Sequence, residues 1–224
     1  MPDLLLIGGA AISAAVLAAA GPVALSRLPE PEDPDEGKTP YADLGRTRGL
    51  GGGLAAFVAL YAGVAAALLP EPALIGVWIL LGAFGGLLAF VDWHTHLLPR
   101  YLVWPLFVLV WIALGIGAAI AGDAEIVLHA LYGNLAVFAA FWLLYLVAGV
   151  FFRGGFGYGD VRLSAALGAA LGPFGIAPTF LGIYAGFALG AIVGVVRQRG
   201  RLRGQAPLAF GPFMILGAIG GLLV

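Results

Sequence analysis

The sequence predicts an all-α fold, a polytopic membrane bundle of about eight transmembrane helices. Of its 224 residues, 62% are hydrophobic and 10% are charged, and the mean hydropathy is +1.03. These values lie far outside the range of soluble globular domains. Apolar stretches recur along the chain, and roughly 20 apolar residues suffice for one helical span. No stretch shows the alternation of a membrane barrel, so we expect helices throughout.

Polar interruptions divide the chain into spans. The first is preceded by Met-Pro-Asp without a basic residue, so we expect a retained helix rather than a cleaved signal peptide. The sixth is short and bounded by Gly172 and Pro173, so its loops should be lined by protein or lie at the interface. A re-entrant sixth segment would reduce the count to seven. The approximate spans are residues 4–25, 50–69, 73–91, 101–121, 126–152, 161–171, 176–196 and 207–224.

The basic residues predict the orientation of these spans. Short cytoplasmic loops are enriched in Lys and Arg. All 11 basic residues of the chain follow odd-numbered spans, which were assigned from hydropathy alone. We therefore expect the odd-numbered loops in the cytoplasm and both termini outside. The basic residues are Arg27, Lys38, Arg46, Arg48, Arg100, Arg153, Arg162, Arg197, Arg199, Arg201 and Arg203.

The longest connection, residues 26–49, contains the sequence LPEPEDPDEGK. A segment so rich in proline and acid cannot bury a core of its own, so we expect a mobile cytoplasmic loop. The chain then divides into residues 1–48, which hold the first span and this acidic loop, and residues 49–224, which hold the other spans.

Composition also limits the chemistry. The chain has no Cys, which excludes disulfides, thiolate metal sites and a cysteine nucleophile, and it has only three His. We expect neither a metal nor a cofactor. The net charge of -1 argues against nucleic-acid binding, and the expected partner is the lipid bilayer.

Two acids lie outside the loops, turns and N-terminus that hold the other ten. Asp92 ends the third span in GLLAFVDWHTHLLPR, and Asp160 opens the sixth in GYGDVRL. Ionisable groups at membrane depth are costly and are candidates for function. An aspartate at a helix start is also a common N-cap, which is the alternative for Asp160, whereas the macrodipole of its own helix does not favour Asp92.

Two such acids on one face of the membrane indicate a catalytic dyad. Close carboxylates do not readily ionise together, so they share a proton, and one acts as a base on water while the other acts as an acid. Gly154, Gly155, Gly157 and Gly159 remove side chains from the approach to Asp160. A phosphate-binding loop is the competing reading of these glycines, but no strand precedes them and no Lys-Ser/Thr ending follows.

Four ordered segments resemble those of type IV prepilin peptidases. GYGDVRLSAALGAALG is similar to the family's GxGD motif, FVDWHTHLLPRYLVWP to its other aspartate segment, and APLAFGPFMILGA to its closing proline and FGPF stretch. GPVALSRLP is similar to an early family segment that ends in Arg-Leu-Pro. The matches fall in order over nearly the whole chain.

The resemblance implies a membrane aspartic endopeptidase that removes the short basic leader of prepilins or pseudopilins. It would lie in a bacterial cytoplasmic membrane with its active site facing the cytoplasm, and residues 49–224 would form the peptidase core. Asp92 and Asp160 would be the catalytic pair, and Gly157 and Gly159 would shape the backbone. Arg162 stands where the family motif usually has Lys. The supporting residues implied are Arg162, Pro207, Gly211 and Pro212.

One departure concerns N-methylation of the new N-terminus, which many family members also catalyse. Their first cytoplasmic loop carries a pair of Cys-x-x-Cys motifs, and here the corresponding loop is short, acidic and without Cys. The loop therefore does not support methyl transfer. Two other functions stay open at this point: a presenilin-like intramembrane protease, which also pairs an aspartate with GxGD, and a proton-coupled transporter with carboxylates near mid-membrane.

Overall fold

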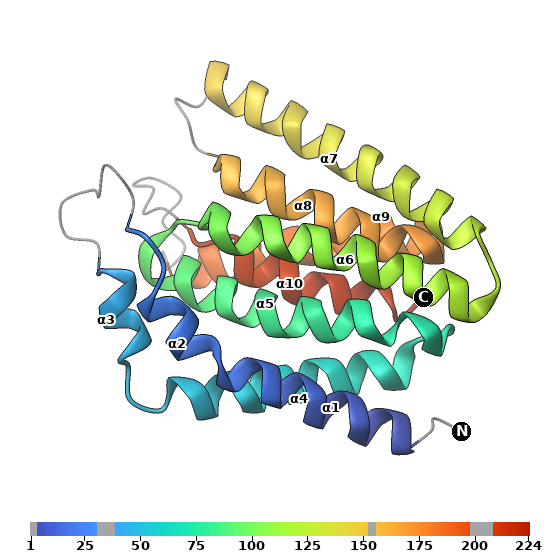
Figure 1. Cartoon of the computed structure of the whole chain (residues 1–224). Coiled ribbons are helices and arrows are strands. Elements are labelled where there is room, and N and C mark those ends of the chain that lie inside the picture. The colour runs from blue at the N-terminus through green and yellow to red at the C-terminus, as the bar shows by residue number, and fades with distance from the viewer. Residues whose placement is uncertain (1–3, 31–38, 152–155, 198–207) are drawn as a thin grey trace.

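A computed structural model describes residues 4–30, 39–151, 156–197 and 208–224. These residues form helices and connecting turns, without a strand. The helices lie roughly alongside one another in an elongated bundle (Figure 1). The α-helices are α1 (Leu4–Ala19), α2 (Gly21–Ser26), α3 (Tyr41–Gly45), α4 (Leu50–Leu68), α5 (Ile75–Thr95), α6 (Arg100–Ala121), α7 (Glu125–Phe151), α8 (Tyr158–Leu171), α9 (Ile176–Arg197) and α10 (Gly211–Gly221), with 3₁₀ turns η1 (Pro72–Leu74) and η2 (Gly172–Phe174).

Among the described residues, 6 helical segments are long and apolar enough to cross a membrane. The polytopic helical bundle is thus confirmed, whereas two of the expected eight spans are shorter helices, α8 with 14 residues and α10 with 11. The six long segments are Leu4–Ser26, Leu50–Leu68, Pro72–Thr95, Arg100–Ala121, Glu125–Phe151 and Ile176–Arg197.

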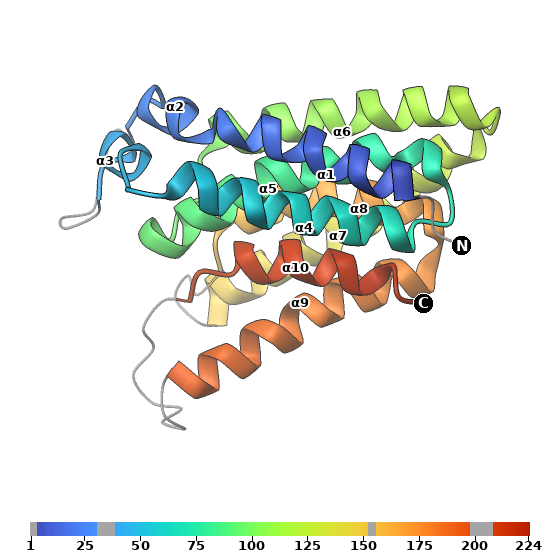
Figure 2. The same cartoon turned by 90° about the horizontal axis from the view of Figure 1, so that it is seen from below.

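Helix α8 is short because protein, rather than lipid, surrounds it. From Leu163 to Leu171 all of its residues are buried, and it packs on α7, α6 and α10. Figure 2 shows the bundle from another side, with α9 and α10 along one edge of the bundle. A helix enclosed in this way does not need the full length of a lipid-exposed span.

Small residues set the closest helix contacts. A Cβ at Gly168 of α8 would collide with the backbone oxygen of Gly133 in α7, and a Cβ at Gly217 of α10 would collide with the backbone nitrogen of Gly186 in α9. Without a hydrophobic force between helices in lipid, such close backbone packing is a main source of association. These contacts hold α8 on α7 and α10 on α9.

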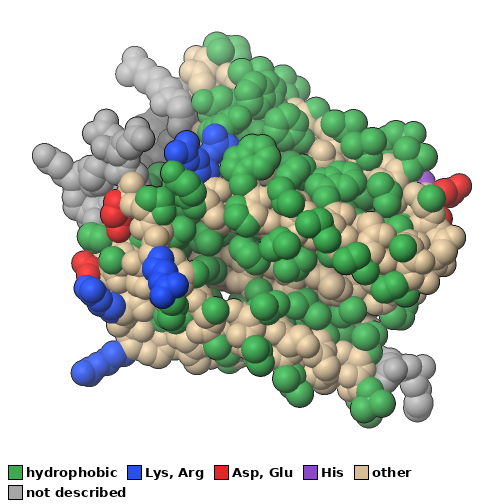
Figure 3. All heavy atoms as spheres, in the orientation of Figure 1, with side chains coloured by type: hydrophobic (Ala, Val, Ile, Leu, Met, Phe, Trp, Pro, Cys, Tyr) green, Lys and Arg blue, Asp and Glu red, His purple; other side chains and the backbone are tan. Residues whose placement is uncertain are grey.

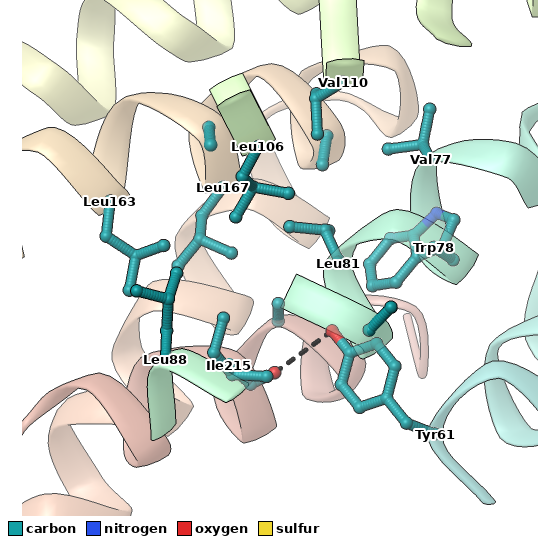
Figure 4. Packing of buried hydrophobic residues seen from close by; sticks show 14 of the residues in the cluster. Tyr61, Val77, Trp78, Leu81, Leu88, Leu106, Val110, Leu163, Leu167 and Ile215 are labelled. Carbon is teal, nitrogen blue, oxygen red and sulfur yellow. Dashed lines mark hydrogen bonds between the residues drawn. The ribbon is translucent and has the colours of Figure 1, made fainter. Parts of the chain in front are cut away.

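A core of large apolar side chains lies between α4, α5, α6, α8 and α10. Trp78, Leu81, Leu106, Leu167 and Ile215 are fully buried, and Figure 4 shows how they interdigitate. The hydroxyl of Tyr61 donates to the backbone oxygen of Ile215 at 3.2 Å (Figure 4). This core joins the helices that carry the two candidate aspartates.

The charged side chains visible in Figure 3 gather at the two ends of the bundle, and a largely apolar band lies between them. The described basic residues lie where α2, α3 and α9 end and where α4, α6 and α8 begin. These termini share one end of the bundle, opposite the N- and C-termini (Figure 1). Five basic residues lie outside the described residues: Lys38, Arg153, Arg199, Arg201 and Arg203.

The expectation of an unstructured loop after the first span is wrong for residues 41–45. They form α3, in which Tyr41 and Leu44 are buried. A Cβ at Gly45 would lie 2.7 Å from the backbone oxygen of Pro22, so α3 packs directly against α2. The acid-rich stretch has too few apolar residues for a core of its own, but these two side chains join the core of the bundle.

Candidate active site

Asp92 lies in the last turn of α5 and is 4% exposed. Its Oδ2 accepts a hydrogen bond of 2.8 Å from the backbone N–H of Gly211, the first residue of α10. The first N–H groups of a helix have no partner within the helix and carry partial positive charge. The α10 N-terminus therefore provides the favourable dipole that the C-terminal end of α5 does not offer to Asp92.

Asp160 is the third residue of α8 and is partly buried. The backbone N–H of Gly157, the residue that precedes the helix, interacts favourably with its carboxylate. This is the backward reach of an acidic residue at the third helical position of a capping box. Asp160 thus stabilises the helix start from inside the first turn, and it is not the N-cap that the alternative reading expected.

Leu98 connects the surroundings of the two acids. It lies in the short connection between α5 and α6. A Cβ at Gly159 would be 2.8 Å from Leu98 Cβ, and a Cβ at Gly211 would be 3.2 Å from Leu98 Cδ2. Leu98 therefore packs against the glycine beside Asp160 and against the glycine bonded to Asp92, and the two carboxylates are close enough to interact electrostatically.

The glycines of the predicted site leave room for these acids. A Cβ at Gly157 would lie 3.0 Å from Asp160 Oδ2, and a Cβ at Gly211 would lie 3.0 Å from Asp92 Oδ2. None of Gly157, Gly159 and Gly211 has a positive φ. These three glycines allow close approach of their neighbours, and the left-handed freedom of glycine is not used.

The other predicted supporting residues do not all lie at the acid pair. Pro212 is the second residue of α10, where proline is well tolerated because an N–H in the first turn has no acceptor within the helix and none is lost. Pro207 lies outside the described residues. Arg162 lies about 200° around α8 from Asp160, and its guanidinium stacks on the ring of Tyr158 at 4.3 Å. Arg162 therefore faces away from the acid pair.

Sequence reasoning missed Leu98 as part of the site. The short HLLPR connection between two spans was visible, but only the packing shows that Leu98 meets both aspartate-bearing segments. His96 ends α5 with φ 55, and its N–H donates to the backbone oxygen of Asp92 at 2.8 Å. It therefore terminates the helix that carries Asp92.

The described histidines do not assemble a metal centre. His94 Nδ1 lies 2.8 Å from the backbone oxygen of Phe90, and its ring packs on the Phe90 ring at 4.4 Å. Within the described part of the chain, no group of three or more His, Asp and Glu is placed to hold a metal ion. The chemistry that the geometry offers is acid–base catalysis by two carboxylates.

Two cavities in the bundle do not include either carboxylate in their linings. One, of about 370 Å³, lies between α4 and α5 and is lined by Arg48, Leu50, Phe57, Ala89 and Phe90 among others. The second, of about 350 Å³, lies between α6, α7 and α8. Arg162 lines the second cavity, on the far side of α8 from Asp160.

Comparison with known families finds a match over the part of the chain that contains both acids. The family model described as the type IV leader peptidase family matches residues 79–195, a range that includes Asp92 and Asp160. No solved structure matches the chain.

Several curated relatives carry related names. The "Prepilin leader peptidase/N-methyltransferase" of Burkholderia pseudomallei (strain 1026b) is 44% identical over 92 residues, which is 41% of this chain and 28% of that protein. The protein of the same name from Pseudomonas aeruginosa is 40% identical over 88 residues, which is 39% of this chain and 28% of that protein. "Leader peptidase HopD" of Escherichia coli is 33% identical over 93 residues, which is 41% of this chain and 59% of that protein. The chain thus matches less than a third of the first two relatives.

Proposed function

Because the chain belongs to the type IV leader peptidase family, we propose that it is a membrane aspartic endopeptidase that removes the leader of type IV prepilins or pseudopilins. The observation that carries this proposal is the pairing of Asp92 and Asp160. The two acids come from separate helices and meet around Leu98 in a partly enclosed site.

The reaction follows from the shared proton of the pair. The ionised carboxylate removes a proton from a water molecule, and the water oxygen attacks the scissile carbonyl carbon. The protonated carboxyl gives its proton to the carbonyl oxygen, which forms a neutral tetrahedral intermediate. When the intermediate collapses, the carboxyl that took the water proton passes it to the leaving amine and the C–N bond breaks. One hydroxyl of the intermediate returns its proton to the other carboxylate, which restores the pair. The products are the leader with a new carboxyl group and the mature protein with a new amino terminus.

Backbone N–H groups near the two carboxylates orient them for the reaction. The Gly211 N–H holds Oδ2 of Asp92 and leaves its other oxygen for water or substrate. The Gly157 N–H interacts favourably with the Asp160 carboxylate at the start of α8. Carboxylates positioned by backbone donors need little reorganisation during the reaction, which is the basis of electrostatic preorganisation.

We propose further that the pair faces the cytoplasm of a bacterium. The described basic residues lie at the same end of the bundle as both acids, and short cytoplasmic loops are rich in Lys and Arg. A basic leader would then be cleaved on the side where it is made. The proposal covers the peptidase step alone, because no Cys is present for the loop motifs that accompany methyl transfer.

The test is processing of a co-expressed prepilin in a bacterium that lacks its own prepilin peptidase. The wild type is expected to shorten the prepilin, as seen by gel mobility and by the mass of the new N-terminus. Asp92→Asn and Asp160→Asn are each expected to abolish shortening at equal membrane abundance. Asp123→Asn, in the turn after α6, is the matched control and should process normally, since its Oδ1 only accepts from the Glu125 N–H. Processing that survives both dyad substitutions would refute the proposal.

A further inference from the structure

We propose that the cavity between α6, α7 and α8 binds one anionic phospholipid, with its phosphate on Arg162 and an acyl chain along the groove. The cavity holds about 350 Å³, and its lining combines one cation with aromatic and aliphatic side chains. The lining residues used below are Arg162, Tyr158, Trp104, Phe107, Leu135 and Phe138.

The polar end of the groove is the guanidinium of Arg162. Within the described residues Arg162 takes part in no ion pair, and its guanidinium stacks on the Tyr158 ring at 4.3 Å. Stacking uses the face of the guanidinium and leaves its N–H edge free to donate. The guanidinium fork matches a phosphate group well. A partly buried arginine in an apolar cleft is costly unless an anion accompanies it.

The position of this arginine fits a lipid headgroup. Arg162 lies in the first turn of α8, at the end of the bundle where the basic residues gather. Trp104 and Tyr158 flank it and are 55% and 39% exposed, as expected of aromatic side chains at a membrane interface. Basic pockets between transmembrane helices on the cytoplasmic side bind anionic headgroups.

The rest of the groove fits an acyl chain. From Tyr158 to Ala165 the lining of α8 extends over about 10 Å, at 1.5 Å per residue. Phe107 and Phe138 form apolar walls, and Leu135 is 54% exposed, which leaves the groove open on the lipid side. At the inner end, the Asn134 side-chain N–H donates to the backbone oxygen of Ala165 at 2.7 Å, so its amide does not need the ligand.

The test is native mass spectrometry of the full chain, purified in detergent and stripped of endogenous lipid, with phosphatidylglycerol or phosphatidylcholine added. We expect one tightly bound phosphatidylglycerol and weaker phosphatidylcholine binding. Arg162→Gln should weaken phosphatidylglycerol binding by about tenfold or more, as for loss of a charge-assisted hydrogen bond. Arg48→Gln removes a charge at the same end of the bundle but outside this groove, and should bind as the wild type does.

Two further arms identify the ligand. Leu135→Trp narrows the groove and keeps Arg162, and it should also weaken phosphatidylglycerol binding. Excess inorganic phosphate should leave the bound lipid in place. Equal binding by the wild type and Arg162→Gln would overturn the proposal. So would displacement of the lipid by inorganic phosphate, which indicates a simple anion site, or by a synthetic prepilin segment, which indicates a substrate groove.

Discussion

Gly211→Ala tests whether the α10 N-terminus positions the Asp92 carboxylate. The new Cβ would lie 3.0 Å from Asp92 Oδ2 and 3.2 Å from Leu98 Cδ2, so one or both must move by a few tenths of an ångström. Forcing a side chain off its preferred rotamer costs about 0.5–1.5 kcal/mol. Because 1.36 kcal/mol corresponds to a tenfold change in rate, we expect kcat to fall about two- to tenfold. The fold should be unaffected, since Gly211 has no positive φ.

The assay is the steady-state cleavage of a purified prepilin by the detergent-solubilised protein, with the thermal midpoint of unfolding measured in parallel. Gly149→Ala is the matched control, because a Cβ at Gly149 meets nothing within 4 Å; its kcat should equal that of the wild type. A wild-type kcat in Gly211→Ala would refute the positioning role. A loss of kcat that is matched by a lower unfolding midpoint would show a general structural effect instead.

Three other predictions concern helix packing, one buried hydrogen bond and the titration of the acid pair. Gly168→Ala should destabilise the bundle by roughly 2 kcal/mol or more, because its Cβ collides with the Gly133 oxygen and lies 2.8 Å from Val137 Cβ. If Gly168→Ala and the control Gly149→Ala unfold at the same denaturant concentration, this prediction is wrong. Tyr61→Phe should cost about 1 kcal/mol, the usual value of one hydrogen bond, since it removes the 3.2 Å bond to Ile215 and keeps the ring, and an unchanged free energy of unfolding would argue against that bond. Cleavage rate should depend on pH in a bell shape, rising as the base of the pair loses its proton and falling as the acid loses the shared proton; a rate that stays constant as pH rises past neutrality would exclude a protonated acid in the reaction.

The sequence predicted the helical bundle because burial in lipid imposes a local rule. The backbone N–H and C=O groups of each span must form hydrogen bonds within that span. The length of an apolar stretch alone therefore shows where a long helix lies. The rule fails for α8 and α10, which protein neighbours enclose and which are shorter than a span. It also fails for α3, because Tyr41 and Leu44 bury themselves against other segments of the chain.

The sequence indicated the two aspartates of the candidate site, but only some of the residues that surround them. Asp92 and Asp160 stood out because charges are rare in spans, and Gly157, Gly159 and Gly211 do lie beside them. The side of α8 that Arg162 occupies could have been read from its two-residue separation from Asp160, which places them on opposite faces. The hydrogen bond from Gly211 to Asp92 joins residues 119 apart in the chain. Such a contact depends on how the helices pack, which local patterns do not specify.

The central claim, that Asp92 and Asp160 act as one unit, is tested most directly by the residual cleavage rates of Asp92→Asn, Asp160→Asn and the double variant. Residues that work as a unit show strongly non-additive losses. We predict that each single substitution lowers kcat by about a thousandfold or more and that the double variant is no slower than the slower single variant. Losses that multiply in the double variant, or a single variant that retains substantial cleavage, would contradict the claim.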